Sequence, residues 1–211
     1  TAHVYRGAML HSISFDELEV LPDAILGTDV DGRILFFLDA STPISAEGGG
    51  PGFSSSPATA PGGSLDISVT TLSAQQFLCP GFVDAHAHAP QHAFTGTALD
   101  LPLLEWLQTY TFPHEARFSD LVHARAIYER AVHSHLRNGS TTVSYFATIH
   151  VEACKLLVDI VREQGQRALV GKVNMDRNAP DNYVETTEAS LLATQAFIDY
   201  VLGLRDPLVT P

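Results

Sequence analysis

Two histidines, His86 and His88, stand one residue apart in the stretch Phe77–Gln91 (FLCPGFVDAHAHAPQ), at the end of a short apolar run. On a β-strand, side chains at i and i+2 lie on one face, with Cα atoms about 6.5–7 Å apart. Two imidazoles can therefore converge on one metal ion, and Asp84 is expected on the same face one step earlier. Imidazole nitrogens suit Zn²⁺ or Fe²⁺. The alternative is a pair of polar residues that closes a strand, because H-x-H alone is a weak signal.

Several side chains near this stretch have two interpretations each. Asp84 could accept a hydrogen bond from a ligand histidine, or it could cap the backbone beside it. His92 could reach the same site, although we expect it to face solvent. Trp106 could wall a binding pocket, or it could be a core aromatic on an amphipathic helix. Of Tyr145 and Phe146, one must face the helices and the other a pocket, because successive strand residues point to opposite faces.

Composition excludes some classes of function. Of the 211 residues, 45% are hydrophobic and 17% charged, which predicts a globular core. A net charge of -12, from 24 acidic and 12 basic residues, argues against a nucleic-acid partner. We expect no membrane span, since no run of 18 apolar residues occurs. Without the layout of a secretory signal, and with Cys79 and Cys154 as buried free thiols, a cytosolic protein is expected.

The first part of the chain predicts strands, with a hairpin that turns near Asp31–Gly32. Residues 41–64 are then dominated by Gly, Pro and Ser, which predicts a flexible surface insertion without chemistry. Strand character returns at DISVTTLS, before the histidine motif.

From residue 77, strand and helix patterns alternate. The apolar run Phe77–Val83 predicts one strand with a kink or bulge at Pro80–Gly81, and LPLLEWLQTY predicts a short helix. A longer helix is predicted from Ser119, as N-cap, to Asn138–Gly139. Its predicted buried stripe consists of Ala124, Ile127, Tyr128, Ala131 and His135. The neighbouring His133 and His135 do not face each other on a helix, so they are expected to be surface or packing residues.

Two further strands are predicted at STTVSYFAT and RALVGKVNM, two further helices at VEACKLLVDIVREQG and ETTEASLLATQAFIDYVLGL, and DPLVTP opens another strand. This alternation predicts an α/β fold with parallel strands and crossover helices. Three units plus the opening of a fourth fit either an open sheet or part of a (β/α)₈ barrel, which takes about 250 residues. Because the chain ends inside a strand-like segment, we favour a barrel truncated after about three βα units.

A resemblance to a known family adds to this interpretation. PGFVDAHAH resembles the first barrel strand of the amidohydrolase superfamily. The segments HAHAPQHAF, LDLPLLEWLQTYTFPHE, LRNGSTTVSYFATIH, GQRALVGKVNMD and ETTEAS together resemble the guanine deaminases of that superfamily. The Gly/Pro/Ser insertion is the main departure. The resemblance implies that residues 1–76 form the N-terminal part of a small β-sandwich domain and that residues 77–211 form the first, incomplete part of a metal-dependent (β/α)₈ barrel.

The resemblance also implies roles for single residues. His86 and His88 match the first two zinc ligands, and Gln91 matches the glutamine that hydrogen-bonds the purine. His88 and Trp106 are the other expected substrate contacts. The third ligand histidine, the acid/base glutamate and the ligand aspartate lie on later strands in the family. They are expected C-terminal to Pro211, so no catalytic acid or base is expected within this chain. One Zn²⁺ per subunit is expected, with Fe²⁺ as the alternative, and a carbamylated Lys172 bridge does not fit this mononuclear branch.

The activity implied is hydrolysis of guanine to xanthine and ammonia, by attack of a zinc-activated hydroxide on C2 while a carboxyl group shuttles protons. The implied protein is a cytosolic homodimer of purine catabolism with guanine as its small-molecule partner and no nucleic-acid or membrane partner. Two alternatives stay open. The substrate could be a different purine, a triazine or a pyrimidine, or this chain alone could be an inactive fragment that cannot complete the metal site.

Overall fold

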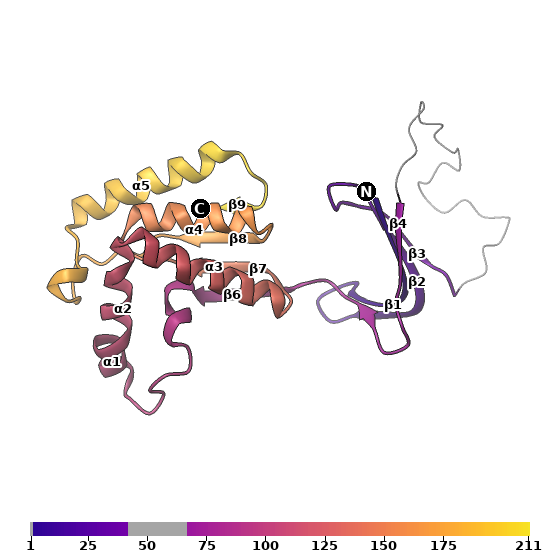
Figure 1. Cartoon of the computed structure of the whole chain (residues 1–211), viewed down its shortest axis with the longest axis horizontal. Helices are drawn as coiled ribbons and strands as arrows, with labels where there is room; N and C mark the ends of the chain where they lie inside the picture. The colour runs from indigo at the N-terminus through magenta and orange to yellow at the C-terminus, as the bar shows by residue number, and fades with distance from the viewer. Residues whose placement is uncertain (1, 42–66) are drawn as a thin grey trace. The chain divides into compact units, whose positions relative to one another are not determined.

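The computed structural model describes residues 2–41 and 67–211, which belong to two compact units, Thr1–Pro80 and Gly81–Pro211 (Figure 1). The predicted insertion at 41–64 lies outside the described residues except for Ser41. The units divide after Pro80 rather than after residue 76, because residues 77–78 pair with the first strand of the N-terminal unit.

The described part of the N-terminal unit forms one mixed sheet. Its strands are β1 (Ala2–Ser12), β2 (Leu18–Thr28), β3 (Ile34–Asp39), β4 (Ile67–Thr71) and β5 (Phe77–Leu78). The strand order is β3-β2-β1-β4, and β5 also pairs with β1. Strand β1 is antiparallel to β2 but parallel to β4 and β5. The second sheet that a sandwich needs is not among the described residues of this unit.

The β2–β3 connection confirms the predicted hairpin. The carboxylate of Asp29 accepts hydrogen bonds from the backbone N–H groups of Asp31 and Arg33, at 2.9 and 2.8 Å. Gly32 has φ of +80°, a left-handed conformation that glycine adopts without a steric penalty.

The prediction of one strand over Phe77–Val83 is wrong, because the run is divided between the two units. Its first part is β5, and its last part begins β6 (Phe82–His88) in the other sheet. Pro80 has no backbone N–H to continue a ladder. A Cβ at Gly81 would overlap the side chain of Thr141, so only glycine allows this close approach.

The C-terminal unit contains a parallel sheet in chain order. Strand β6 pairs with β7 (Ser140–Phe146), β7 with β8 (Arg167–Gly171), and β8 with β9 (Val209–Thr210). All three pairings are parallel, which confirms the prediction of parallel strands. The carboxyl ends of β6, β7 and β8 therefore lie at one edge of the sheet, where polar side chains from different strands can meet.

Helices connect these strands. They are α3 (Leu121–Arg137), α4 (Val151–Glu163) and α5 (Thr187–Leu204), one in each crossover (Figure 1). The β6–β7 crossover also carries the 3₁₀ turn η1 (Ala89–Phe94) and a helical segment built from α1 (Leu103–Trp106), the π-helical turn Leu107–Thr111, α2 (Phe112–Ala116) and the 3₁₀ turn Arg117–Ser119. A further 3₁₀ turn, Asp181–Tyr183, precedes α5. The predicted short helix thus continues beyond residue 110.

Helix α3 tests the predicted boundaries directly. Its N-cap is Asp120 and not Ser119, because the Asp120 carboxylate accepts from the backbone N–H groups of Val122 and His123. The predicted end is confirmed, since the helix stops at Arg137 and Gly139 follows with φ of +88°.

The core of this unit forms where α3, α4 and α5 cover the sheet. The predicted stripe on α3 is buried except for its last member, His135, which is half-buried. It packs with residues of the other elements, including Val143, Tyr145, Leu157, Ile160, Val170 and Phe197. Burying these side chains holds β6 and the segments that follow it in place. None of the helices in the described ranges is long and apolar enough for a membrane span.

Candidate metal and substrate site

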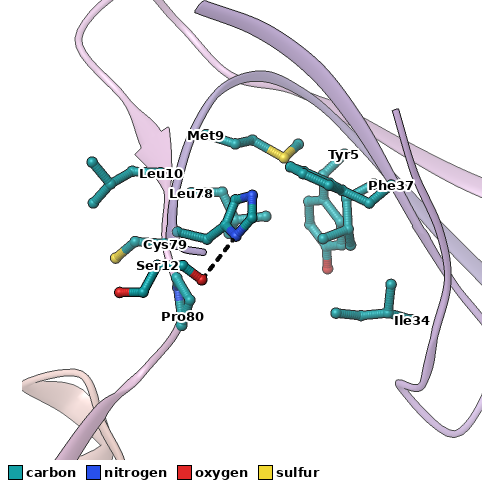
Figure 2. A pocket seen from close by; sticks show the side chains of 11 residues that line it. Tyr5, Met9, Leu10, Ser12, Ile34, Phe37, Leu78, Cys79 and Pro80 are labelled. Carbon is teal, nitrogen blue, oxygen red and sulfur yellow. Dashed lines mark hydrogen bonds between the residues drawn. The ribbon is translucent and has the colours of Figure 1, made fainter. Parts of the chain in front are cut away.

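One hollow lies within the N-terminal unit and has a volume of about 590 Å³. Figure 2 shows Tyr5, Met9, Phe37 and Leu78 around it, and most of its lining is apolar. His11 also lines it, but both ring nitrogens already have partners. One lies 2.8 Å from a Glu19 carboxylate oxygen and the other 3.3 Å from the Ser12 carbonyl. This hollow offers little convergent polar chemistry.

The second hollow, of about 420 Å³, lies in the C-terminal unit at the end of β6. His86, His88, Gln91 and His92 line it together with residues of α3. A concave site with several convergent titratable groups is the stronger candidate for chemistry, although it is the smaller of the two.

The structure brings His86 and His88 together. Their Nε2 atoms lie 3.2 Å apart and point toward one another. That arrangement suits either one N–H···N hydrogen bond or two ligands of a single ion. Burial, and then the nearby His86 ring, lower the pKa of His88. The Nδ1 atom of His88 is buried and has no hydrogen-bond partner among the described residues.

Phe146, at the end of β7, packs against both imidazoles. Its ring centroid lies 4.7 Å from that of His86 and 4.8 Å from that of His88, and the His88 ring is nearly parallel to it. The adjacent Tyr145 is buried and donates a hydrogen bond to the Gln166 side chain. The expected division of this pair is confirmed, with Phe146 next to the histidines and Tyr145 in the core.

Asp84 lines the same hollow as the two histidines. The register of β6 against β7 shifts between Asp84 and Ala87. One carboxylate oxygen accepts from the backbone N–H of His86 at 3.1 Å, and the other lies 3.4 Å from His135 Nε2. Of the two interpretations, the structure shows the backbone cap, and it shows His135 as a packing residue.

His92 is half-buried and lines the hollow, so the expectation that it faces solvent is wrong. The turn η1 directs the chain back toward α3 immediately after β6, which brings His92 over that helix. Burial, followed by the charges of His135 and Arg130, lowers the pKa of His92.

Trp106 is not brought to the hollow. Its indole N–H donates to the Thr97 carbonyl at 3.0 Å, and its ring lies 5.5 Å from that of Phe94. These contacts favour the packing interpretation over a pocket wall.

Gln91 lies beside a buried group that the sequence did not single out. Its Nε2 atom is 3.4 Å from Oε1 of Glu115 on α2, and the other carboxyl oxygen of Glu115 accepts a 2.6 Å hydrogen bond from the Tyr183 hydroxyl. Burial raises the pKa of Glu115, while the hydrogen bonds from Tyr183 and Gln91 oppose that effect. No helical or strand periodicity marks Glu115 as special, since a buried charged residue is visible only in three dimensions.

A complete metal site is not found within the described ranges, where no group of three or more His, Cys, Asp or Glu side chains converges. Lys172 does not take part either. Its buried Nζ donates to Glu185, to Asn174 and to the Val173 carbonyl. Among the described residues, His86 and His88 do lie close together, and their role as metal ligands stays a prediction.

Comparison with known proteins matches residues 77–210 to the amidohydrolase family. Guanine deaminase from Dictyostelium discoideum is 44% identical over 222 residues, which cover 99% of this chain and 45% of the relative. Guanine deaminase from Homo sapiens is 42% identical over 217 residues, which cover 100% of the chain and 45% of the relative. The chain thus spans about half the length of the curated relatives it matches.

Solved structures give the same similarity at the level of the fold. A crystal structure of guanine deaminase from C. acetobutylicum with guanine bound in the active site has a TM-score of 0.76 and 29% identity, and the match covers 100% of this chain and 45% of that one. E. coli guanine deaminase has a TM-score of 0.74 and 28% identity, and the match covers 94% of this chain and 42% of that one.

Proposed function

The chain belongs to the amidohydrolase family, and from this premise we propose that the whole protein is a guanine deaminase, which hydrolyses guanine to xanthine and ammonia. The observation that carries the proposal is the convergence of His86 and His88 in a hollow that also presents the amide of Gln91. The relatives that match the full length of this chain support guanine as the substrate.

The geometry of the histidine pair fits a metal ion. Tetrahedral zinc with Zn–N bonds of 2.0–2.1 Å places two ligand nitrogens about 3.3 Å apart. The observed separation of 3.2 Å agrees with this value. We propose that His86 and His88 hold zinc, with iron as the alternative. When bound, zinc would act as a Lewis acid and make a water molecule acidic enough to serve as a nucleophile near neutral pH.

The side chains of this chain would position the substrate and the ligands. Gln91 would hydrogen-bond the purine edge, because its amide has one acceptor and two N–H donors on a single group. Phe146 would fix the planes of both imidazoles by stacking, and Asp84 would fix the backbone that carries His86. Together these contacts would reduce the freedom of the two ligands before any ion binds.

The finer architecture is also a proposal. The family and the solved relatives establish an α/β amidohydrolase fold. We propose that residues 77–211 are the first part of a (β/α)₈ barrel, and that the N-terminal sheet belongs to a small β-sandwich domain. Parallel strands in chain order, joined to one another by helix-containing crossovers, support the barrel.

We also propose a cytosolic protein without nucleic-acid or membrane partners. Two free cysteines and a net charge of -12 support these proposals. The homodimer rests on the resemblance alone.

The decisive experiment is an assay of the purified full-length gene product, loaded with zinc, for conversion of guanine to xanthine and release of ammonia. His86→Ala and His88→Ala should each lower bound zinc and abolish turnover, whereas His133→Ala on the exposed face of α3 should change neither. Adenine, cytosine and melamine in place of guanine test the other ring systems. Zinc-loaded protein that leaves guanine intact, or that deaminates another ring faster, would contradict the proposal.

A further inference from the structure

A buried carboxyl group stands behind Gln91 without lining the hollow. Glu115 on α2 is only 4% exposed, and both of its oxygens have partners within the described chain. Oε2 accepts a 2.6 Å hydrogen bond from the Tyr183 hydroxyl, and Oε1 faces Nε2 of Gln91 at the longer distance of 3.4 Å. Gln91 is therefore the link between this buried pair and the hollow where His86 and His88 converge.

A glutamine amide has two ends of nearly equal shape and opposite hydrogen-bonding character. Because the two ends have nearly the same shape, packing alone does not decide which of them faces a ligand. The choice matters, since the oxygen accepts a hydrogen bond and the nitrogen donates one. An ionised carboxylate accepts only, so a carboxylate beside Gln91 selects the NH₂ end for itself. The Gln91 oxygen and the second N–H are then left for the substrate.

Tyr183 keeps the carboxyl group in place. It is fully buried, its ring lies 6.0 Å from that of Phe112 on α2, and its hydroxyl binds Glu115 across 68 residues of sequence. Removing a carboxylate from water is costly unless it is hydrogen-bonded, and Tyr183 supplies a short bond in the interior. The turn Asp181–Tyr183 and helix α2 are thereby connected behind the site.

We propose that Glu115, held by Tyr183, is a positioning residue that fixes the orientation of the Gln91 amide and thus the hydrogen-bond pattern that the purine meets. The proposal rests on the proposed function for the identity of the ligand. The orientation of the amide itself does not depend on that identity.

The sharpest variant is Glu115→Gln, which keeps the shape of the side chain. The Tyr183 hydroxyl can still donate to the new carboxamide oxygen, which leaves an NH₂ group facing Gln91. The Gln91 amide must then turn round to accept from it. KM for guanine should rise about tenfold, the loss expected for one hydrogen bond to a charged group, with kcat changed less than about twofold. Tyr183→Phe keeps the carboxyl group and should raise KM by about threefold.

Matched controls separate positioning from general stability. Glu105→Gln makes the same substitution at an exposed glutamate of the preceding helix α1. Tyr200→Phe removes an equivalent 2.6 Å tyrosine–carboxylate hydrogen bond, that of Tyr200 with Asp159, away from the hollow. Both should leave KM unchanged. Equal KM in folded Glu115→Gln protein and in the wild type would overturn the proposal.

A second measurement tests the orientation of the Gln91 amide even if the wild type is inactive on guanine. Such inactivity would contradict the proposed function but not the positioning role of Glu115. In protein labelled with ¹⁵N-glutamine, the side-chain NH₂ signal of Gln91 can be assigned by its loss in Gln91→Asn. That signal should shift in Tyr183→Phe and in Glu115→Gln and should be unchanged in both controls. An unshifted signal in both variants would show that Glu115 does not orient Gln91.

Discussion

At the scale of single residues, burial controls the reactivity of Cys154. Its thiol is buried and donates to the Thr148 carbonyl at 3.2 Å, and burial raises its pKa to about 11. At pH 8 only about one thiol in a thousand would be the reactive thiolate. We therefore expect iodoacetamide to label the half-exposed Cys79 in the folded protein and to spare Cys154.

The labelling of Cys154 should rise about tenfold per pH unit toward pH 11, as the thiolate fraction increases. Mass spectrometry of labelled peptides, with Cys79→Ser and Cys154→Ser proteins to assign them, measures each site separately. Rapid labelling of Cys154 at pH 8 before unfolding would contradict the expectation.

Residues that act through local spacing could be predicted from the sequence, and residues that act through tertiary contacts could not. His86 and His88 were predicted because i and i+2 share a strand face. The register shift between Asp84 and Ala87 could not be predicted, because it depends on how β6 pairs with β7 and not on the local pattern. Glu115 and Tyr183 are 68 residues apart, so only the folded chain shows them as a pair.

At the scale of elements, the N-cap of α3 is Asp120 in the structure, whereas the sequence predicted its neighbour Ser119. Asp120 accepts from two backbone N–H groups, at 2.9 and 3.3 Å, whereas the Ser119 hydroxyl donates to the Ala116 carbonyl behind it. Asp120→Ala should lower the free energy of unfolding by about 1 kcal/mol. Ser119→Ala should change it by less than about 0.5 kcal/mol. Urea denaturation measures both, and a larger loss in Ser119→Ala would restore the sequence-based assignment.

A buried ion pair connects the residue that follows β8 to the segment that precedes α5. Lys172 Nζ lies 2.7 Å from Glu185, and the two side chains are 0% and 12% exposed. Lys172→Met should cost about 3–5 kcal/mol of unfolding free energy, because it leaves the Glu185 charge buried without its cation. Lys155→Met breaks a more exposed pair with Glu152 and should cost about 1 kcal/mol or less.

The double variant Lys172→Met/Glu185→Leu should recover much of the loss, since it removes both charges. Thermal unfolding of the four proteins provides the comparison. Equal losses of unfolding free energy in Lys172→Met and Lys155→Met would show that the buried pair contributes no more to stability than the exposed pair.

The regular elements of the C-terminal unit follow from local signals. Apolar spacing and glycine stops predict α3, and β-branched residues predict β7. The division of Phe77–Val83 between two sheets could not be predicted in the same way. Every residue in that run suits a strand, and only the pairing of Phe77–Leu78 with β1 shows where the first unit ends.

At the scale of the whole molecule, the parallel sheet has apolar side chains in contact with solvent. Phe82 and Val83 on β6 are 64% and 71% exposed, and Leu169 on β8 is 48% exposed. Exposed apolar surface of this kind promotes association or aggregation. The proposed barrel would bury such side chains against further strands.

Whether residues 1–211 by themselves are sufficient for the proposed activity depends on how many metal ligands they provide. They supply His86 and His88, and no third potential metal ligand converges with these two in the described part of the chain. Catalytic zinc sites use three protein ligands in most enzymes, so two histidines should hold the ion weakly. We expect residues 1–211, expressed alone and loaded with zinc, to form no xanthine from guanine, while the full-length gene product does.

Zinc affinity provides the matching control for that comparison. Competition with a chromogenic chelator should show weak zinc binding by residues 1–211 that His88→Ala removes, because both histidines would be needed to hold the ion. Zinc binding that survives in both His86→Ala and His88→Ala would place the ion elsewhere. Xanthine formation by residues 1–211 alone would mean that this chain contains a full set of ligands and a proton-transfer group, in conflict with the two-ligand site.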